Sequence, residues 1–384
     1  MKINQLDLFS GIGGFHLGFE MAGFEVTSYF SEIDPHAIAV YKKQFKNSTY
    51  VGSVTDLRGD SLPDIDLITF GSPCQDFSLA GKRQGMAGQR SSLILEAIRL
   101  IKEKRPRVFI WENVKGTFSS NSGEDFAAIL QEFTDIGGYR LDWQLLNTSW
   151  FLPQNRERIY LVGYSSEVRG DWTGVFPIGE SYSTDSRPLR IEVVGDRGTG
   201  GQQGLIYGEE GLSPTINAST YKDPVKLRIK QIGTRLDSGG KQPYQQDRVC
   251  DADGIVPALN QGKSDLILRV RSATKSGYEE ASVGDSVNLS QPNSKTRRGR
   301  VGKQKAQTLE TSCNQAVVDG FQIRRLTPIE TERLQGFPDN HTAFGDYDGT
   351  IKPVSNTQRY RQCGNAVTVD VVQAIASKLK HIFE

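Results

Sequence analysis

The chain has 384 residues, of which 37% are hydrophobic and 24% are charged, and these proportions are typical of an ordinary soluble protein. Its length exceeds the ~250–300 residues that one hydrophobic core usually serves, so two domains are expected. The formal net charge of +1 excludes a globally basic nucleic-acid-binding protein, and any nucleic-acid contact must come from a local basic patch. No signal peptide and no apolar run of about 18 residues are recognised, which favours a cytoplasmic protein over a secreted or membrane-spanning one.

Residues 1–165 alternate predicted strands and helices. The predicted strands are 5–9, 26–30, 66–70, 108–111, 140–146 and 158–162. One predicted helix follows the first strand and ends near Met21, and three others cover 37–45, 93–102 and 123–133. Apolar residues repeat at helical spacing in 93–102, and glycine or proline marks several of the boundaries. This alternation predicts an α/β fold with a doubly wound sheet.

The character of the sequence changes after residue 178. Residues 195–211 contain seven glycines, and helical periodicity disappears from this part of the chain. We interpret 179–320 as a separate, smaller, irregular and β-rich domain inserted after the domain 1–178. The segment 321–384 is helical again, with Pro328 at a first helical position and a last helix at about 369–382.

The segment from Asp7 to Phe15 reads as a strand, a glycine turn and a helix, which lets a ligand approach backbone amides closely. A dinucleotide fingerprint would need a third glycine where His16 stands. At the end of the second strand, Glu32 could bond both ribose hydroxyls and Ile33 could stack on an adenine, or the segment is a solvated acidic strand end. A nucleoside cofactor without a pyrophosphate fits this pattern, and S-adenosylmethionine is one.

Two strand ends carry side chains suited to catalysis. Pro73 fixes the backbone just before Cys74, at a place suited to a nucleophile, although a free cysteine is often a small buried hydrophobe. Glu112 ends another strand, where partial desolvation could raise its pKa enough for proton donation, or the residue is structural. Arg156 and Arg158 could point together toward a base carbonyl or a phosphate, or form salt bridges within their own segment.

The remaining cysteines are Cys250, Cys313 and Cys363, and they have no CxxC spacing. Neither a metal site nor a disulfide framework is expected, which again fits a reducing cytoplasm.

The ordered motifs of this chain resemble those of DNA (cytosine-5)-methyltransferases. The segments that carry the resemblance are Asp7–Gly14, Gly71–Ser78, Glu112–Val114, Gln154–Arg158, Arg325–Thr327 with Leu334–Pro338, and Gly364–Val367. They cover 1–165 and 322–384, and chance agreement of all of them in order is negligible. The resemblance is therefore highly specific.

This resemblance implies a Rossmann-like methyltransferase that acts on C5 of a cytosine flipped out of a specific duplex DNA sequence. Cytosine C5 is a poor nucleophile, so the Cys74 thiolate would first add to C6. Glu112 would relieve the negative charge at N3. Arg158 and Arg156 would hold the base carbonyl and help to keep Cys74 ionised. The methyl donor would be S-adenosylmethionine.

The resemblance also implies the other site residues. The cofactor is expected to contact Phe9, Ser10, Gly11, Ile12, Gly13, Gly14, Glu32, Ile33, Ser53, Val54, Pro73, Asn365 and Ala366. DNA is expected to contact Gln75, Ser78 and Arg90 around the closing loop 78–92. Independently of the resemblance, the basic composition of residues 295–305 adds Arg297, Arg298, Arg300 and Lys303 as expected DNA contacts. The expected partner is double-stranded DNA, for a monomer encoded by a bacterium or a phage. Either a cognate restriction endonuclease acts separately beside it, or the enzyme is solitary, and the sequence leaves both open.

Two positions depart from the family pattern. Ser53 stands where the family commonly has an aspartate that bonds the adenine amino group, so cofactor binding could be weaker. Ser91 follows Arg90 where glycine is usual, which bears on the flexibility of the closing loop. Neither departure affects Cys74.

The middle domain is implied to be the target-recognition domain. Residues 295–305 carry six lysines and arginines and no acid, interrupted by Gly299 and Gly302. This composition is typical of a loop that tracks phosphates, and the alternative is a solvated basic turn. Composition does not determine which bases such a loop would read.

Two other functions remain open. An RNA-directed cytosine-5 methyltransferase of the tRNA-modifying kind would have a shorter middle domain and a Cys-Phe-Thr motif, and that tripeptide is absent. A catalytically dead member that only binds DNA would be expected to lose the Pro73-Cys74 pair or the motif 112–114. This chain keeps both.

Overall fold

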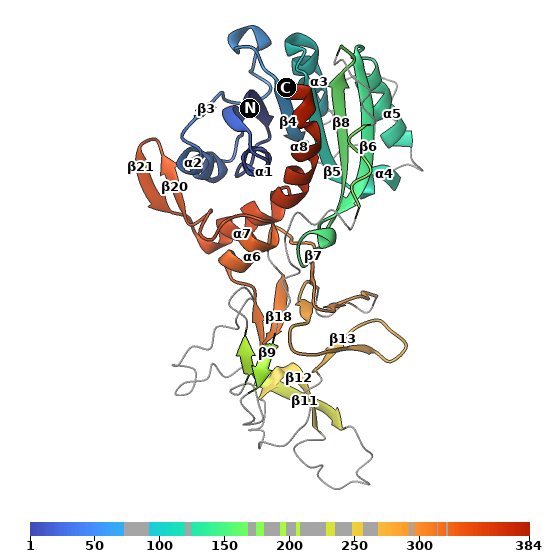
Figure 1. The fold of residues 1–384 in the computed structure, drawn as a ribbon. Coiled ribbons are helices and arrows are strands. Elements are labelled where there is room, and N and C mark those ends of the chain that lie inside the picture. Colours follow the sequence, from blue (N-terminus) through green and yellow to red (C-terminus); the bar gives the residue numbers. More distant parts are fainter. Residues whose placement is uncertain are drawn as a thin grey trace. The chain divides into compact units, whose positions relative to one another are not determined.

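A computed structural model describes residues 1–72, 92–119, 124–167, 174–179, 193–196, 205–207, 228–234, 248–255, 268–291, 294, 296–312, 314–319 and 322–384 (Figure 1). The chain divides into two compact units. The first comprises Met1–Thr184, Thr308–Ser312 and Thr327–Glu384, and the second comprises Asp185–Gln307 and Cys313–Leu326. None of the helices in the described ranges is long and apolar enough to cross a membrane.

The first unit is built on a seven-stranded sheet with the order β3-β2-β1-β4-β5-β8-β6 (Figure 1). Its strands are β1 (Lys2–Leu8), β2 (Glu25–Ser31), β3 (Ser48–Tyr50), β4 (Leu67–Gly71), β5 (Val108–Val114), β6 (Tyr139–Asn147) and β8 (Glu157–Ser165). Strands β1 to β5 are parallel, whereas β8 runs antiparallel to both β5 and β6. The strand order reverses between β1 and β4, and ligands of open α/β sheets bind at the carboxyl ends of strands beside such a reversal.

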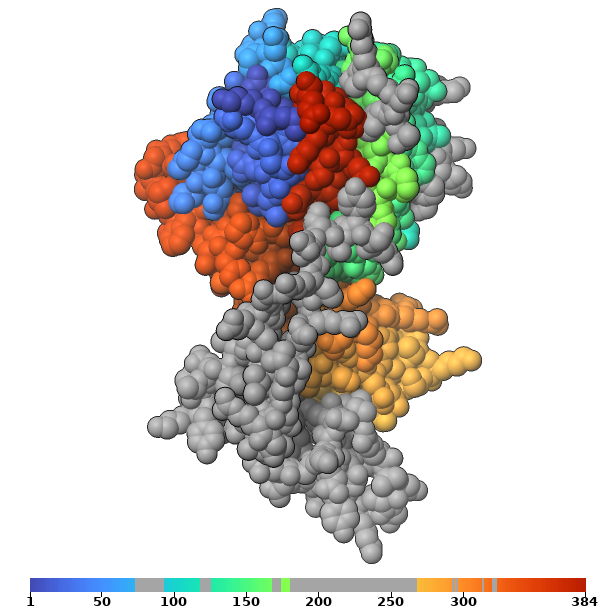
Figure 2. Space-filling model, viewed as in Figure 1, coloured from blue at the N-terminus to red at the C-terminus, as the bar shows by residue number. Residues whose placement is uncertain are grey.

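Helices cover both faces of this sheet. Helices α1 (Gly14–Met21) and α8 (Val369–Phe383) pack on one face, and α3 (Ser92–Lys104) and α5 (Glu124–Thr134) pack on the other. The surface of α8, red in Figure 2, lies between blue residues from the N-terminal part of the chain and green residues. Because side chains alternate along a strand, Leu6 and Leu8 face α3 while Gln5 and Asp7 face the opposite layer. The predicted doubly wound α/β fold is confirmed.

Shorter elements complete the first unit. They are α2 (Pro35–Gln44), α4 (Gly116–Ser119), α6 (Pro328–Leu334), α7 (Asn356–Asn365), the two 3₁₀ turns Gly59–Ser61 and Thr148–Trp150, the short strand β7 (Gln154–Asn155) and the hairpin of β20 (Phe344–Tyr347) and β21 (Thr350–Pro353). Helix α6 begins with a capping box, in which Thr327 Oγ1 accepts from Glu330 N at 3.2 Å and Glu330 Oε2 accepts from Thr327 N at 2.7 Å. This is the helix start that Pro328 predicts.

Every element described in the second unit is a strand. The antiparallel pairs are β9 (Val193–Asp196) with β10 (Leu205–Tyr207), β11 (Arg228–Thr234) with β12 (Arg248–Ile255), and β13 (Leu268–Arg271) with β14 (Tyr278–Ala281). A four-stranded sheet joins β16 (Val301–Gly302), β15 (Ser286–Asn288), β18 (Gln315–Asp319) and β19 (Gln322–Arg325), and β17 covers Ala306–Gln307. A small apolar core that includes Leu268, Ala281, Val287 and Val318 packs β13 and β14 against this sheet.

Candidate active site

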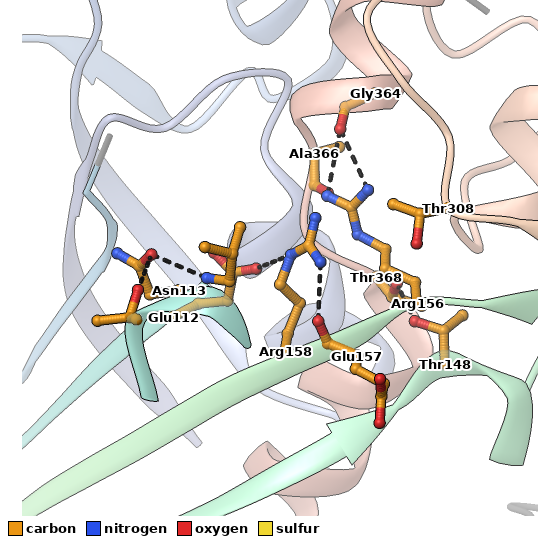
Figure 3. A network of polar contacts seen from close by, with 12 residues as sticks. Glu112, Asn113, Thr148, Arg156, Glu157, Arg158, Thr308, Gly364, Ala366 and Thr368 are labelled. Carbon is orange, nitrogen blue, oxygen red and sulfur yellow. Dashed lines mark hydrogen bonds and ion pairs between the residues drawn. The ribbon is translucent and has the colours of Figure 1, made fainter. Parts of the chain in front are cut away.

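Glu112 and Arg158 form an ion pair between the neighbouring strands β5 and β8 (Figure 3). In the antiparallel ladder Arg158 lies opposite Val114, two positions from Glu112, so both side chains reach the same face. Arg158 Nε is 3.1 Å from Glu112 Oε1. Burial raises the pKa of the Glu112 carboxyl, and the charges of Arg158 and Arg156 only partly oppose this effect. The carboxyl therefore takes up a proton more readily than an exposed glutamate does.

The end of β4 lies directly beside this carboxyl. Gly71 pairs with Glu112, and a Cβ at position 71 would lie 3.1 Å from Glu112 Oε2, so a side chain there would crowd the carboxyl. The next residue, Ser72, is held by β5, because Trp111 Nε1 donates to Ser72 Oγ at 3.0 Å and Asn113 Nδ2 donates to Ser72 O at 3.1 Å. The chain therefore leaves β4 from a fixed point next to Glu112.

Asn113 has a second role at this strand end. Its Oδ1 accepts from Val114 N at 2.8 Å and from Thr117 Oγ1 at 3.0 Å (Figure 3), so one buried amide joins β4, the end of β5 and α4. The sequence placed Asn113 in a motif but did not predict that it holds Ser72. The predicted nucleophile and four other predicted site residues follow Ser72 in the sequence and are outside the described residues: Cys74, Pro73, Gln75, Ser78 and Arg90.

Arg156 was predicted to act beside Arg158, but its guanidinium is directed elsewhere. It is 3% exposed and donates to Gly364 O at 3.2 Å and to Ala366 O at 2.8 Å (Figure 3). Burial, together with the charge of Arg158, lowers the pKa of Arg156 to about 9. In this structure Arg156 therefore supports the end of α7, where Ala366 is buried and Asn365 is exposed.

The glycine turn after β1 forms as its residues require. Phe9, Gly11 and Gly13 all have positive φ angles, of 52°, 54° and 85°. At Gly13 a Cβ would also lie 2.2 Å from the ring of Phe45, so this position is closed to any other residue. Ile12 is buried, and its carbonyl accepts from His341 Nε2 at 2.9 Å.

Glu32 joins this turn to the end of β2. Its Oε2 accepts from Gly11 N at 2.9 Å, and its Oε1 accepts from Ile33 N at 2.8 Å and from Asp34 N at 3.0 Å. Since a carboxylate has about four acceptor positions, one remains for a ligand hydroxyl. Two more features fit a nucleoside with a polar tail: Ile33 is 78% exposed, and the buried Ser10 Oγ has no partner among the described residues.

The segment that follows β3 carries the expected adenine neighbours. Ser53 Oγ lies 2.9 Å from Thr55 Oγ1 and caps the local turn, and Val54 is buried. The serine hydroxyl is therefore engaged within its own turn. Within the described ranges, no group of His, Cys, Asp and Glu side chains has the arrangement of a metal site.

A buried polar cluster that the sequence did not predict lies beneath the glycine turn. Asp7 Oδ1 accepts from Thr69 Oγ1 at 2.8 Å, and its Oδ2 accepts from Tyr41 OH at 3.2 Å. Tyr41 OH also lies 2.8 Å from Ser28 Oγ and 3.1 Å from His16 Nδ1. Burial raises the pKa of Asp7 to about 8, because these hydroxyls stabilise the carboxylate less than water would.

The described part of the basic run 295–305 belongs to the second unit. Arg298 is exposed, and its Nε donates to Ala273 O at 2.8 Å, while Arg297 is half-buried. Lys303 Nζ pairs with Asp285 Oδ2 at 2.6 Å. Arg300, by contrast, is 3% exposed and its Nη2 donates to Gln291 O. Its guanidinium is therefore buried against the backbone and is not on the surface of the basic run.

Comparison with known proteins identifies the family to which the chain is similar. The model of a family described as C-5 cytosine-specific DNA methylase matches residues 3–381. The orphan methyltransferase M.SPRI of Bacillus phage SPR is 29% identical, over 100% of this chain and 98% of its own length. The type II methyltransferase M1.ScrFI of Lactococcus lactis subsp. cremoris is 30% identical, over 100% of this chain and 79% of its own length.

A solved structure shows the same fold. It is the crystal structure of a DNA modification methyltransferase encoded within a prophage (E. coli), with a TM-score of 0.54, 21% sequence identity and 99% of both chains covered.

Proposed function

Because the chain belongs to the family of C-5 cytosine-specific DNA methylases and is a DNA (cytosine-5)-methyltransferase, we propose that it methylates a flipped cytosine through a covalent bond between Cys74 Sγ and cytosine C6. The observation that supports this mechanism best is the fixed start of the loop at Gly71 and Ser72, beside the Glu112 carboxyl. Cys74 follows Gly71 by three residues, which limits the distance between their Cα atoms to about 11 Å. A thiolate and a carboxyl can therefore serve the same base.

The chemistry requires electron density at cytosine C5. The Cys74 thiolate forms the S–C6 bond, and the C5=C6 electron pair moves to C5 while Glu112 hydrogen-bonds N3 and stabilises the charge on the ring. Arg158 orients Glu112 through their ion pair, and its positive charge favours the thiolate form of Cys74. After methylation, a base removes the C5 proton, the S–C6 bond breaks and the C5=C6 bond is restored as the thiolate leaves.

We assign the cofactor site to the glycine turn and the ends of β2 and β3. S-Adenosylmethionine, when bound there, supplies the electrophilic methyl group that C5 takes. Glu32 would accept from a ribose hydroxyl, Ile33 would cover the adenine, and Ser10 Oγ would bond the polar tail. The full set is Phe9, Ser10, Gly11, Ile12, Gly13, Gly14, Glu32, Ile33, Ser53, Val54, Pro73, Asn365 and Ala366.

We assign a specific duplex DNA sequence as the substrate and residues 179–320 as the target-recognition domain. Gln75, Ser78 and Arg90 would contact the target strand from the loop after β4, and Arg297, Arg298 and Lys303 would contact phosphates. Arg300 would act by supporting these residues, because it is buried. The protein would act as a cytoplasmic monomer, and a restriction endonuclease of the same specificity would act separately.

The test is transfer of a labelled methyl group from S-adenosylmethionine to unmethylated duplex DNA, followed by identification of 5-methylcytosine. Cys74→Ser should lose at least about a thousandfold in rate, whereas the control Cys250→Ser should retain the rate. Duplex DNA with 5-fluorocytosine should be trapped covalently by the wild type and not by Cys74→Ser, because fluorine at C5 cannot leave as a proton does. Unmodified tRNA is offered as substrate in a parallel reaction. Equal labelling of DNA by the serine variant, or labelling of tRNA and not of DNA by the wild type, would contradict the proposal.

A further inference from the structure

We propose that Glu279 is a positioning residue for DNA binding, because its carboxylate holds the backbone of the basic loop, defined as residues 297–303, in a fixed conformation. The inference rests on the proposed function, since it assumes that the basic loop contacts DNA phosphates. Glu279 is acidic and lies beside the basic loop, yet we expect it to strengthen the binding of DNA, which is a polyanion. Charge alone would give the opposite effect.

Three consecutive amides of the loop converge on this one carboxylate. Glu279 Oε1 accepts from Gly299 N at 2.8 Å and from Arg300 N at 3.3 Å, and Oε2 accepts from Val301 N at 3.1 Å. The hydroxyl of Ser272 also donates to Oε1. Gly299 has a φ of 64°, the left-handed conformation that lets successive amides turn inward around an anion.

The electrostatics agree with this geometry. Burial by itself would raise the pKa of Glu279, but the hydrogen bonds from Ser272 and from the amides of Val301, Arg300 and Gly299 outweigh burial, so the pKa is lowered. The carboxylate therefore remains charged at neutral pH, and bonds from amides to a charged acceptor are about twice as strong as neutral ones.

Glu279 is itself held on a rigid support. It lies in β14, where it pairs with Val270 of β13, and the neighbouring Ala281 and Leu268 are in the apolar core of the unit. The far end of the loop is fixed in the same manner by Asp285, which accepts from Lys303 Nζ at 2.6 Å and from Gln304 N at 3.2 Å. Two carboxylates thus fix the path of the backbone from which the exposed Arg298 projects.

An ordered loop should bind DNA more tightly than a mobile one, because it loses less conformational entropy when it binds. Glu279→Gln keeps the size of the side chain but removes the charge that three amides share. Glu280→Gln is a matched control: Glu280 is the next residue, is exposed, and pairs with Arg269 Nε at 3.4 Å without contacting the loop amides. Both substitutions add the same charge to the unit.

The experiment measures fluorescence anisotropy of labelled unmethylated duplex DNA with the full-length protein over a series of salt concentrations. We expect Glu280→Gln to bind as the wild type or up to about twofold more tightly, and Glu279→Gln to bind about tenfold more weakly with a reduced salt slope. Binding of S-adenosylmethionine, measured by calorimetry, should not change in either variant. Equally tight DNA binding by the two variants would overturn the proposal.

Two further variants separate the ways in which the idea can fail. Arg298→Gln tests the DNA contact itself, and an unchanged DNA affinity and salt slope in this variant would reject the basic loop as a DNA contact. If Arg298→Gln binds DNA more weakly while Glu279→Gln binds it as the wild type does, only the positioning role of Glu279 is rejected. If Glu279→Gln does not fold, Ser272→Ala replaces it, because this change leaves the charge of the carboxylate and removes the bond from Ser272 Oγ to Glu279 Oε1. It also removes the longer contact of Ser272 Oγ with Arg297 O, at 3.5 Å. It should weaken DNA binding about threefold, and unchanged binding would overturn the proposal.

Discussion

Asp7→Asn should stabilise the protein, and the gain should increase with pH. Asp7 is fully buried in β1, and its two oxygens lie against the hydroxyls of Thr69 and Tyr41. An asparagine reproduces the protonated acid at this position. Its Oδ1 can accept from Thr69, and its Nδ2 can donate to Tyr41 OH, whose own proton then turns to Ser28 Oγ or His16 Nδ1. The variant therefore keeps both hydrogen bonds and has no proton to lose.

The magnitude follows from the pKa of this carboxyl, which burial raises from 3.8 to about 8. The unfolded chain releases the proton above about pH 4, whereas the folded protein keeps it until about pH 8. The contribution of protonated Asp7 to the free energy of unfolding is therefore complete below the pKa of the unfolded chain. As the pH rises from there toward the pKa of the folded protein, this contribution is lost at about 1.4 kcal/mol per pH unit. Between about pH 6.5 and 8 the free energy of unfolding of the wild type should fall by about 2 kcal/mol because of Asp7.

The assay is urea unfolding followed by tryptophan fluorescence across this pH range. The free energy of unfolding of Asp7→Asn minus that of the wild type should grow by about 2 kcal/mol, and the exposed control Asp64→Asn should run parallel to the wild type. His341 does not interfere, because its titration lies below pH 6.5. A difference that stays constant from the lowest to the highest pH would refute the reasoning, since Asp7 would then be ionised in the folded protein.

Three further outcomes are expected. Arg359→Met leaves the fully buried Glu332 carboxylate without the guanidinium that lies 2.9 Å away. It should lower the free energy of unfolding in urea by about 3–5 kcal/mol, and the double variant with Glu332→Gln should regain part of this loss. An unchanged unfolding midpoint would contradict this prediction. Burial lowers the pKa of His341 to about 4, so the free energy of unfolding should fall by up to about 3 kcal/mol as the pH drops from 6.5 to 4. His341→Gln should remove this part of the acid dependence while keeping a donor for Ile12 O, and an identical acid profile would count against it. Arg156→Lys should lower the free energy of unfolding by about 2 kcal/mol, because a lysine ammonium cannot bond the carbonyls of Gly364 and Ala366 together as the guanidinium does. Slower methyl transfer at unchanged stability would instead indicate that Arg156 contacts the target cytosine.

The sequence by itself determined most elements of the first unit. The predicted strand 66–70 is β4 to within one residue at each end, and the predicted helix 93–102 lies inside α3, because apolar spacing and glycine or proline boundaries are local signals. Helix α7 was missed. Its buried residues are Arg359, Gln362, Cys363 and Gly364, so it has no apolar face for a pattern to detect.

The tertiary structure alone decided which charged groups meet. Arg156 and Arg158 are alternate residues of one segment and received the same predicted role, yet Arg158 pairs with Glu112 and Arg156 holds the carbonyls near Asn365. In the same way Arg300 is buried within a run whose composition marks every residue as a candidate for DNA contact. The hydrogen-bond partners and the burial of these charged side chains depend on residues far apart in the chain, and local apolar spacing does not identify them.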